Sequence, residues 1–235
     1  MTPTVHRHLD DELQRLKETL LEMSHRVEDL LDRAMDALLR GDREAARAVV
    51  ADDAPVNRLE VELDEMCVGL IARHQPVARD LRFVTMAMKI SNDLERMGDH
   101  AVNIAEAVDR LGEVPWSGVR GTLEEMADLS RGMVRDALNA FVRDDSRLAR
   151  DVCPRDDKVD ALDEAVFRLL VSHMMEDPST ITASIQLLLV SRNLERVADL
   201  ATNLAEDVVY LVEGRSIKHH LEKGEGAEPE HRREG

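Results

Sequence analysis

Hydrophobic residues recur along much of this chain at steps of three and four, the spacing that lines one face of an α-helix. The first such stripe predicts a helix of about 30 residues with coiled-coil-like packing, ended by Gly41. Its inward positions are Leu9, Leu13, Leu16, Leu20, Met23, Val27, Leu30, Ala34 and Leu38. The chain is therefore expected to begin as a long amphipathic helix.

Three more helices are predicted in the first half of the chain. Asp42 is expected to cap a short helix over residues 43–51, because an aspartate side chain accepts hydrogen bonds from the free N–H groups of a first turn. A longer helix is predicted from about Pro55 to Arg73. Pro76 is expected to begin a fourth helix that runs to about Leu111, since proline lacks an N–H that the first turn leaves unpaired anyway. The inward stripe of this fourth helix is Phe83, Ala87, Ile90, Leu94, Met97, Ala101, Ile104, Val108 and Leu111.

The chain also repeats itself. Residues 90–111 return 100 residues later as residues 190–211, and 11 of the 22 positions are identical. The identical polar pairs include Glu95/Glu195, Asp99/Asp199, Asn103/Asn203 and Glu106/Glu206. Further upstream, Met23, Leu30, Ala34 and Leu38 match Met126, Met133, Ala137 and Phe141 at an offset of 103. Such self-similarity indicates one supersecondary unit that is used twice.

The predicted fold class is all-α, with two tandem three-helix bundles related by an internal pseudo-twofold repeat. Residues 1–111 are expected to form the first unit, residues 112–118 a linker, and residues 119–213 the second unit. Residues 214–235 carry no sustained hydrophobic period and are expected to be a disordered tail. Pro178 is expected to begin the last helix. Its inward stripe is Ala183, Leu187, Val190, Leu194, Val197, Ala201, Leu204, Val208 and Leu211.

Composition agrees with helices and narrows the class of partner. Aromatic residues make up only 2% of the chain, whereas sandwiches and barrels draw on aromatic and β-branched residues. A formal net charge of −17 argues against nucleic-acid binding, which needs Lys and Arg. No apolar run approaches the roughly 18–20 residues that span a bilayer, and the first residues lack the apolar segment of a signal peptide. A cytoplasmic protein without membrane insertion is expected, with Cys67 and Cys153 as small apolar residues.

Carboxylates and amides line a second face of the same helices. On a helical wheel Glu95, Asp99 and Asn103 share a face opposite the apolar stripe, and Glu195, Asp199 and Asn203 repeat it. The helix before each presents a similar face, made by Asp53 and Asn57 in the first unit and by Asp156 and Asp160 in the second, with Asp163 in third place. Exposure of the outer helix face to solvent is enough to explain a single row of acidic and amide residues of this kind. Repulsion between carboxylates four residues apart, and the return of both asparagines, favour a site for hard cations such as Mg, Mn or Fe.

Enzyme motifs are not found. A ferritin-like di-iron site needs two Glu-x-x-His pairs, and Glu22-x-x-His25 is the single helical one. The chain has no glycine-rich phosphate loop and no plausible Ser/His/Asp set. Arg96 and Arg196, beside these rows of acidic and amide residues, are expected to be salt-bridge partners rather than anion ligands. A protein that is not an enzyme is therefore expected.

Leu94-Glu-Arg-Met-Gly-Asp99 followed by Asn103, and its counterpart from Leu194 to Asn203, resemble the signature of the PhoU phosphate-signalling proteins. The upstream segment from Gln75 to Arg82 does so too, and the resemblance covers about residues 9 to 213. It implies a six-helix homodimer-forming protein that assists phosphate uptake and represses the phosphate-starvation response. Such proteins are thought to link the ATPase of a phosphate ABC transporter to a membrane sensor histidine kinase.

The resemblance also implies metal ligands, because some relatives carry metal ions or iron clusters on Glu/Asp-x-x-x-Asp motifs. Those motifs fall on Glu95/Asp99, Glu195/Asp199 and Asp156/Asp160, while Asp53/Asn57 has an amide in second place. The ions implied are Fe, Mn, Mg or Zn. Ala198 stands where the first unit has Gly98, and its methyl could restrict a helix or a ligand. Two alternatives stay open: a metal-dependent phosphate-ester hydrolase and a metal-storage helical bundle.

Overall fold

The structure, a computed structural model, describes residues 3–111 and 118–214, with side chains from residue 8 onward. Both described ranges are helical and contain no strand. The elements are α1 (Pro3–Arg40), α2 (Arg43–Ala51), α3 (Ala54–His74), α4 (Ala78–Arg110), α5 (Arg120–Arg143), α6 (Ser146–Glu176), the 3-10 turn η1 (Pro178–Thr180) and α7 (Ile181–Glu213). The predicted tail lies outside these ranges apart from Gly214, and the predicted linker apart from Gly118.

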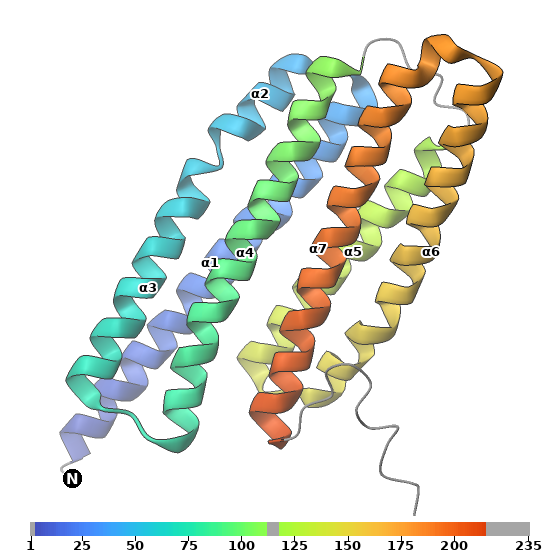
Figure 1. Cartoon of the computed structure of the whole chain (residues 1–235). Helices are drawn as coiled ribbons and strands as arrows, with labels where there is room; N and C mark the ends of the chain where they lie inside the picture. Colours follow the sequence, from blue (N-terminus) through green and yellow to red (C-terminus); the bar gives the residue numbers. More distant parts are fainter. Residues whose placement is uncertain (1–2, 112–117, 215–235) are drawn as a thin grey trace, which may run out of the picture.

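The long helices lie side by side in two layers (Figure 1). α3, α4, α7 and α6 form one layer, and α1 and α5 pack behind it. α4 and α7 occupy the centre, contact each other along their lengths and run in opposite directions. Helices α1 to α4 make one bundle and α5 to α7 the other. The predicted all-α architecture of two tandem bundles is therefore confirmed.

The predicted stripes form the core. All nine inward positions of α4 and all nine of α7 are buried, and so are the α1 positions from Leu16 to Leu38. Removing one such side chain from water stabilises the fold by about 1.5–3 kcal/mol. The core continues between the units, where Phe83 of α4 stacks on Phe141 of α5 with ring centroids 4.8 Å apart. The two units are thus joined partly by apolar contact.

Both predicted proline starts are wrong by two or three residues. α3 ends at His74 and is followed by Gln75, whose φ of 46° is left-handed, and Pro76 and Val77 complete the turn before α4 begins at Ala78. Pro178 begins the 3-10 turn instead of α7, where a side-chain oxygen of Asp177 accepts the Ser179 N–H at 2.9 Å. In both places proline, whose φ is fixed, lies in a tight turn that precedes the first residue of the α-helix.

The units differ at one point along the second helix of each. In the first unit a break at Asp52 and Asp53 separates α2 from α3, whereas α6 continues through the equivalent point with Pro154 inside it. Asp42 and Asp145 cap the equivalent starts, each accepting two backbone N–H groups. The predicted cap at Asp42 is confirmed.

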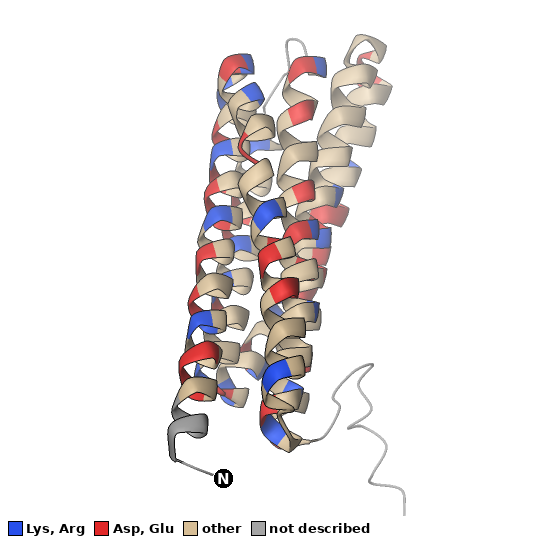
Figure 2. Cartoon of the chain, turned by 90° about the vertical axis from the view of Figure 1, so that its left-hand side faces the viewer, with Lys and Arg blue, Asp and Glu red and all other residues tan. Residues whose placement is uncertain are grey.

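Acidic and basic side chains alternate along the exposed faces of the helices on the α1 and α3 side (Figure 2). Many are joined by ion pairs one turn apart, such as Arg26 with Glu22 at 2.8 Å. Exposed pairs of this kind contribute about 0.3–0.5 kcal/mol each. No helix in the described ranges combines the length and the apolar character needed to cross a membrane.

Candidate functional site

We use the name first acidic groove for the side chains of Asp53, Asn57, Glu95 and Asp99, which lie where the start of α3 meets the middle of α4. Gly98 of α4 makes this approach close, because a β-carbon built there would lie 3.3 Å from Oδ1 of Asp53 and 3.4 Å from Cγ1 of Val56. A side chain larger than hydrogen would press on the Asp53 carboxylate. Gly98 therefore leaves room for the Asp53 carboxylate against α4, whereas the second unit has Ala198 at the equivalent position.

Only one of the two carboxylate oxygens of Asp53 has a hydrogen-bond partner in this groove. Its Oδ2 accepts a hydrogen bond from Nδ2 of Asn57 at 2.7 Å, while its Oδ1 is buried without a hydrogen-bond partner. Burial raises the pKa of Asp53, and the Asp99 carboxylate raises it further. Burial and then the charge of Asp99 also raise the pKa of Glu95. Carboxylates from two helices therefore repel one another here, and the positive charge of Arg96 offsets only part of the effect at Glu95.

The second groove, between α6 and α7, repeats the arrangement with one more carboxylate. Oδ1 of Asp156 is buried without a partner, as is its equivalent at Asp53. Burial raises the pKa of Asp156 to about 6, and the charges of Asp199, Asp160 and Glu195 add to the effect. Burial likewise raises the pKa of Glu195 and of Asp199. The carboxylate pKa values are therefore raised more in this groove than in the first.

Asp163, which shares the polar sequence face of Asp156 and Asp160, makes contacts of its own with α7. It is buried, accepts a hydrogen bond from Oγ of Ser191 at 2.6 Å, and pairs with Nη1 of Arg192 at 2.9 Å. Its charge is therefore already neutralised by groups on α7. The sequence face was right, but the close packing of α6 on α7 turns this carboxylate into a structural contact.

The two predicted asparagines lie away from these carboxylate contacts. Nδ2 of Asn103 donates to Oδ1 of Asn193 on α7 at 3.3 Å, and Nδ1 of His100 lies 2.9 Å from the same oxygen. Asn203 is exposed. Asn103 therefore contributes to the α4–α7 seam. His100 and Asn193, the contacts at this interface of α4 and α7, were not predicted from the sequence because neither residue recurs. Leu200 replaces His100 in the second unit, and Asp93 is the counterpart of Asn193 in the first.

The grooves fit hard cations by the chemistry of their donors. Carboxylate and amide oxygens suit Mg, Mn or Fe, and each groove holds a buried, unpartnered carboxylate oxygen. No three carboxylate, thiol or imidazole groups within the described ranges converge closely enough to make a ready-formed metal site. Like charges on separate helices are expected to stay apart until a cation draws them together.

The two cysteines and the Glu-x-x-His motif are poorly suited to catalysis or metal binding. Burial raises the pKa of the Cys67 thiol to about 12 and that of the half-buried Cys153 to about 11, so neither is a thiolate near neutral pH. Cys67 is a buried apolar residue, as predicted. Glu22 pairs with Arg26, and His25 is exposed, so the Glu-x-x-His motif does not face the bundle core.

Comparison with known proteins places this geometry in a family. The PhoU domain matches residues 20–108 and 123–208, which covers both units. The chain is 38% identical over 224 residues to the phosphate-specific transport system accessory protein PhoU homolog of Pseudomonas putida, covering 93% of this chain and 86% of that one. It is 39% identical over 216 residues to the protein of that name from Aquifex aeolicus, covering 91% and 98%.

Solved structures agree. The crystal structure of PhoU from Pseudomonas aeruginosa superimposes with a TM-score of 0.83 at 37% identity, covering 88% of this chain and 99% of that one. The phosphate transport system regulatory protein PhoU from Streptococcus pneumoniae gives 0.82 at 32% identity, with coverage of 88% and 98%. Sequence, repeat and fold thus agree over nearly the whole described chain, and the chain belongs to the PhoU family.

Proposed function

We propose that this chain is a cytoplasmic accessory protein of a phosphate-specific transport system and a negative regulator of the phosphate-starvation response. The observation that carries the proposal is the match of both units to relatives named as accessory proteins of that system. Identity above a third over more than nine-tenths of the chain is difficult to reconcile with a different role.

Regulation by protein contact is proposed rather than catalysis. Neither thiol is near its ionised form at neutral pH, and His100, which follows the groove carboxylate Asp99, already has its Nδ1 in contact with Oδ1 of Asn193 at 2.9 Å. The long exposed helices instead offer surfaces to protein partners. We propose the ATPase of the phosphate ABC transporter and the sensor histidine kinase of the phosphate response as these partners.

A deletion strain tests this role. Starvation genes should be expressed at high phosphate when the gene is deleted, and a plasmid copy of the intact chain should restore repression. A reporter driven by a phosphate-starvation promoter is the measurement, with phosphate uptake followed in parallel. Normal repression in the deletion strain, with no second copy of the gene, would contradict the proposal.

We further propose that the two grooves bind hard cations, Fe, Mn, Mg or Zn. The buried, unpartnered oxygens of Asp53 and Asp156 support the proposal, as do the raised pKa values around them. The proposed ligands are Asp53, Asn57, Glu95 and Asp99 in the first unit and Asp156, Asp160, Glu195 and Asp199 in the second, with Asn103 and Asn203 one turn beyond. Metal analysis of untagged protein purified without chelator is the first test.

Two assays separate this role from its alternatives. Hydrolysis of a phosphate ester that depends on added metal would favour a hydrolase. Iron uptake well beyond the capacity of two surface grooves would favour storage. We expect neither, because each groove offers few ligands and no substrate-positioning arginine cluster of its own.

A homodimer is also proposed, from the family resemblance. Light scattering at micromolar protein should return about twice the chain mass of 26.5 kDa. A value of 26.5 kDa would contradict the dimer and leave the regulatory role intact.

A further inference from the structure

Two arginines face each other across the α4–α7 seam. The seam register is fixed by Asn193 of α7, whose Oδ1 meets His100 at 2.9 Å and Asn103 at 3.3 Å. α4 and α7 are antiparallel, so the step from His100 back to Arg96 and the step from Asn193 on to Arg196 run the same way (Figure 1). The steps are four and three residues, about 6 and 4.5 Å along the helices. Arg96 and Arg196 therefore lie at nearly the same level.

Arg96 shares a helix face with His100, and Arg196 shares one with Asn193, because residues three or four apart lie on the same side of a helix, and both arginines are exposed. Burial lowers the pKa of His100 most, and the positive charges of Arg196 and Arg96 lower it further, while the hydrogen bond to Oδ1 of Asn193 and the charge of Asp99 raise it. Packed helix axes are about 8–10 Å apart, a gap that two arginine side chains can close. Both guanidinium groups can therefore reach one ligand that sits over the seam.

These arginines retain open hydrogen-bond donors. Within the described ranges Arg196 makes no ion pair or hydrogen bond. Arg96 has one ion pair, 3.6 Å long, with Asp93, and its side chain is 56% exposed. By contrast, the two arginines that line the pocket of about 700 Å³ beside α1 are engaged in ion pairs. Arg26 pairs with Glu22, and Arg33 pairs with Asp52 at 2.6 Å. The seam is therefore the better place for an anion.

We propose that Arg96 and Arg196 together bind one phosphate group across the seam. An arginine fork matches the oxygens of a phosphate and donates two parallel hydrogen bonds, and two forks from opposite sides would hold a dianion. The ligand is either inorganic phosphate or a phosphoryl group on a larger molecule, since both present the same oxygens. This inference rests on the proposed function for its meaning, because it would let the regulator respond to phosphate directly.

The acidic grooves on either side set the conditions for binding. Glu95, Asp99, Glu195 and Asp199 surround the seam with negative charge, which weakens binding of an anion. A divalent cation in each groove would offset that charge, so phosphate should bind more tightly to the Mn²⁺-loaded chain. By linkage, phosphate should then tighten Mn²⁺ binding by the same factor.

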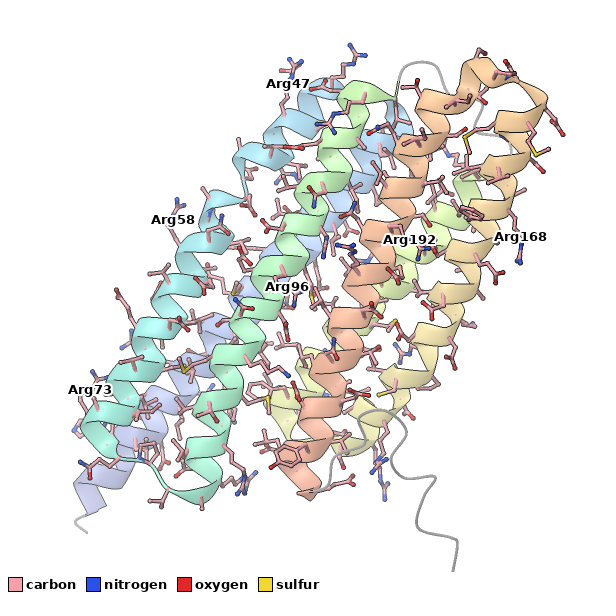
Figure 3. The ribbon with its side chains drawn as sticks, in the orientation of Figure 1. Arg47, Arg58, Arg73, Arg96, Arg168 and Arg192 are labelled. Atoms are coloured by element: carbon pink, nitrogen blue, oxygen red, sulfur yellow. The ribbon has the colours of Figure 1, made fainter. Side chains whose placement is uncertain are left out.

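Calorimetry with the full chain tests the inference. Inorganic phosphate is titrated into protein in chelator and into protein with Mn²⁺, and phenyl phosphate serves as the probe for a carried phosphoryl group. One phosphate per chain is expected, and Arg96→Gln with Arg196→Gln should weaken it about tenfold or more. The matched control is Arg47→Gln with Arg58→Gln, which removes two exposed arginines on the α2–α3 side, far from the seam (Figure 3), and should leave affinity unchanged.

The outcomes are separable. No phosphate binding in either condition, or equal affinity of the seam variant and the native chain, overturns the inference. Binding of phenyl phosphate as well as inorganic phosphate supports a carried phosphoryl group, and binding of inorganic phosphate alone supports the free ion. Mn²⁺ titrations in phosphate-free buffer test the grooves on their own, and the deletion strain tests the regulatory role. Either of those can fail while phosphate binding at the seam stands.

Discussion

Arg33 and Asp52 form an ion pair of 2.6 Å between α1 and the break before α3, and the equivalent pair in the second unit has its charges exchanged. There Asp136 of α5 pairs with Arg155 of α6, also at 2.6 Å. Each partner lies 103 residues from its counterpart. The two units thus keep one contact with opposite polarity, although Arg33 also pairs with Asp29 at 3.1 Å, whose counterpart in the second unit is Gly132.

Exchanging the first pair should therefore be tolerated. Asp52→Arg alone places a second positive charge beside Arg33 and should lower the free energy of unfolding by about 1 kcal/mol. The double change Arg33→Asp with Asp52→Arg restores the pair with the polarity of the second unit and should recover part of that loss, because it also gives up the pair of Arg33 with Asp29. Thermal unfolding of the three proteins measures it. A double variant that is less stable than Asp52→Arg would show that the polarity is fixed by other neighbours.

Gly98→Ala should affect the first groove more than the stability of the fold. Alanine favours a helix by about 1 kcal/mol over glycine, but its methyl would meet Asp53 at 3.3 Å and Val56 at 3.4 Å. These effects oppose each other in stability, while a displaced Asp53 should weaken Mn²⁺ binding in the first unit. Calorimetric titration with Mn²⁺ checks this.

Gly132→Ala is the matched control for that change. Gly132 lies inside α5, and a β-carbon there meets nothing within 4 Å. It should raise the free energy of unfolding by about 0.5–1 kcal/mol and leave Mn²⁺ binding unchanged. If the two glycine variants bind Mn²⁺ equally well, the close approach at Gly98 has no part in the site.

Much of this fold follows from hydrophobic spacing, because helix faces are fixed by a period that sequence displays. All nine predicted inward positions of α4 are buried, and the cap at Asp42 forms as predicted. The period gives the face of a side chain but not its partner. Asp163 was therefore placed on the polar face with Asp156 and Asp160, but its contact could not be predicted, since only the packing of α6 on α7 brings Ser191 to it. The contact of His100 with Asn193 likewise could not be predicted from the sequence.

Asp156→Asn should stabilise the metal-free chain at neutral pH. The pKa of Asp156 is raised to about 6 from its ordinary 3.8 by burial and neighbouring carboxylates, so its ionised form opposes folding. After allowance for solvent screening the gain is about 1 kcal/mol. Urea unfolding in chelator measures it, with exposed Asp160→Asn as the control that should gain less. A loss of stability in Asp156→Asn would contradict the unpaired carboxylate.

Glu28→Gln should reveal a pH dependence at the interface of α1 and α5. Burial raises the pKa of Glu28, partly offset by a hydrogen bond from Ser24. The protonated acid is then favoured by folding, so the penalty is absent well below the ordinary pKa of 4.5 and present in full at neutral pH. The variant should match the native melting temperature in acid and exceed it at neutral pH. A difference that is constant with pH would rule out titration of Glu28 as its cause.

The central claim is that the grooves bind cations and that the second binds more tightly, because it supplies four carboxylates where the first supplies three. Titration of the native chain and of Glu195→Gln with Asp199→Asn by Mn²⁺ tests it most directly, with circular dichroism as the check that both are folded. We expect two classes of site in the native chain and loss of the tighter class in the variant. Equal Mn²⁺ affinity and stoichiometry before and after the change would contradict it.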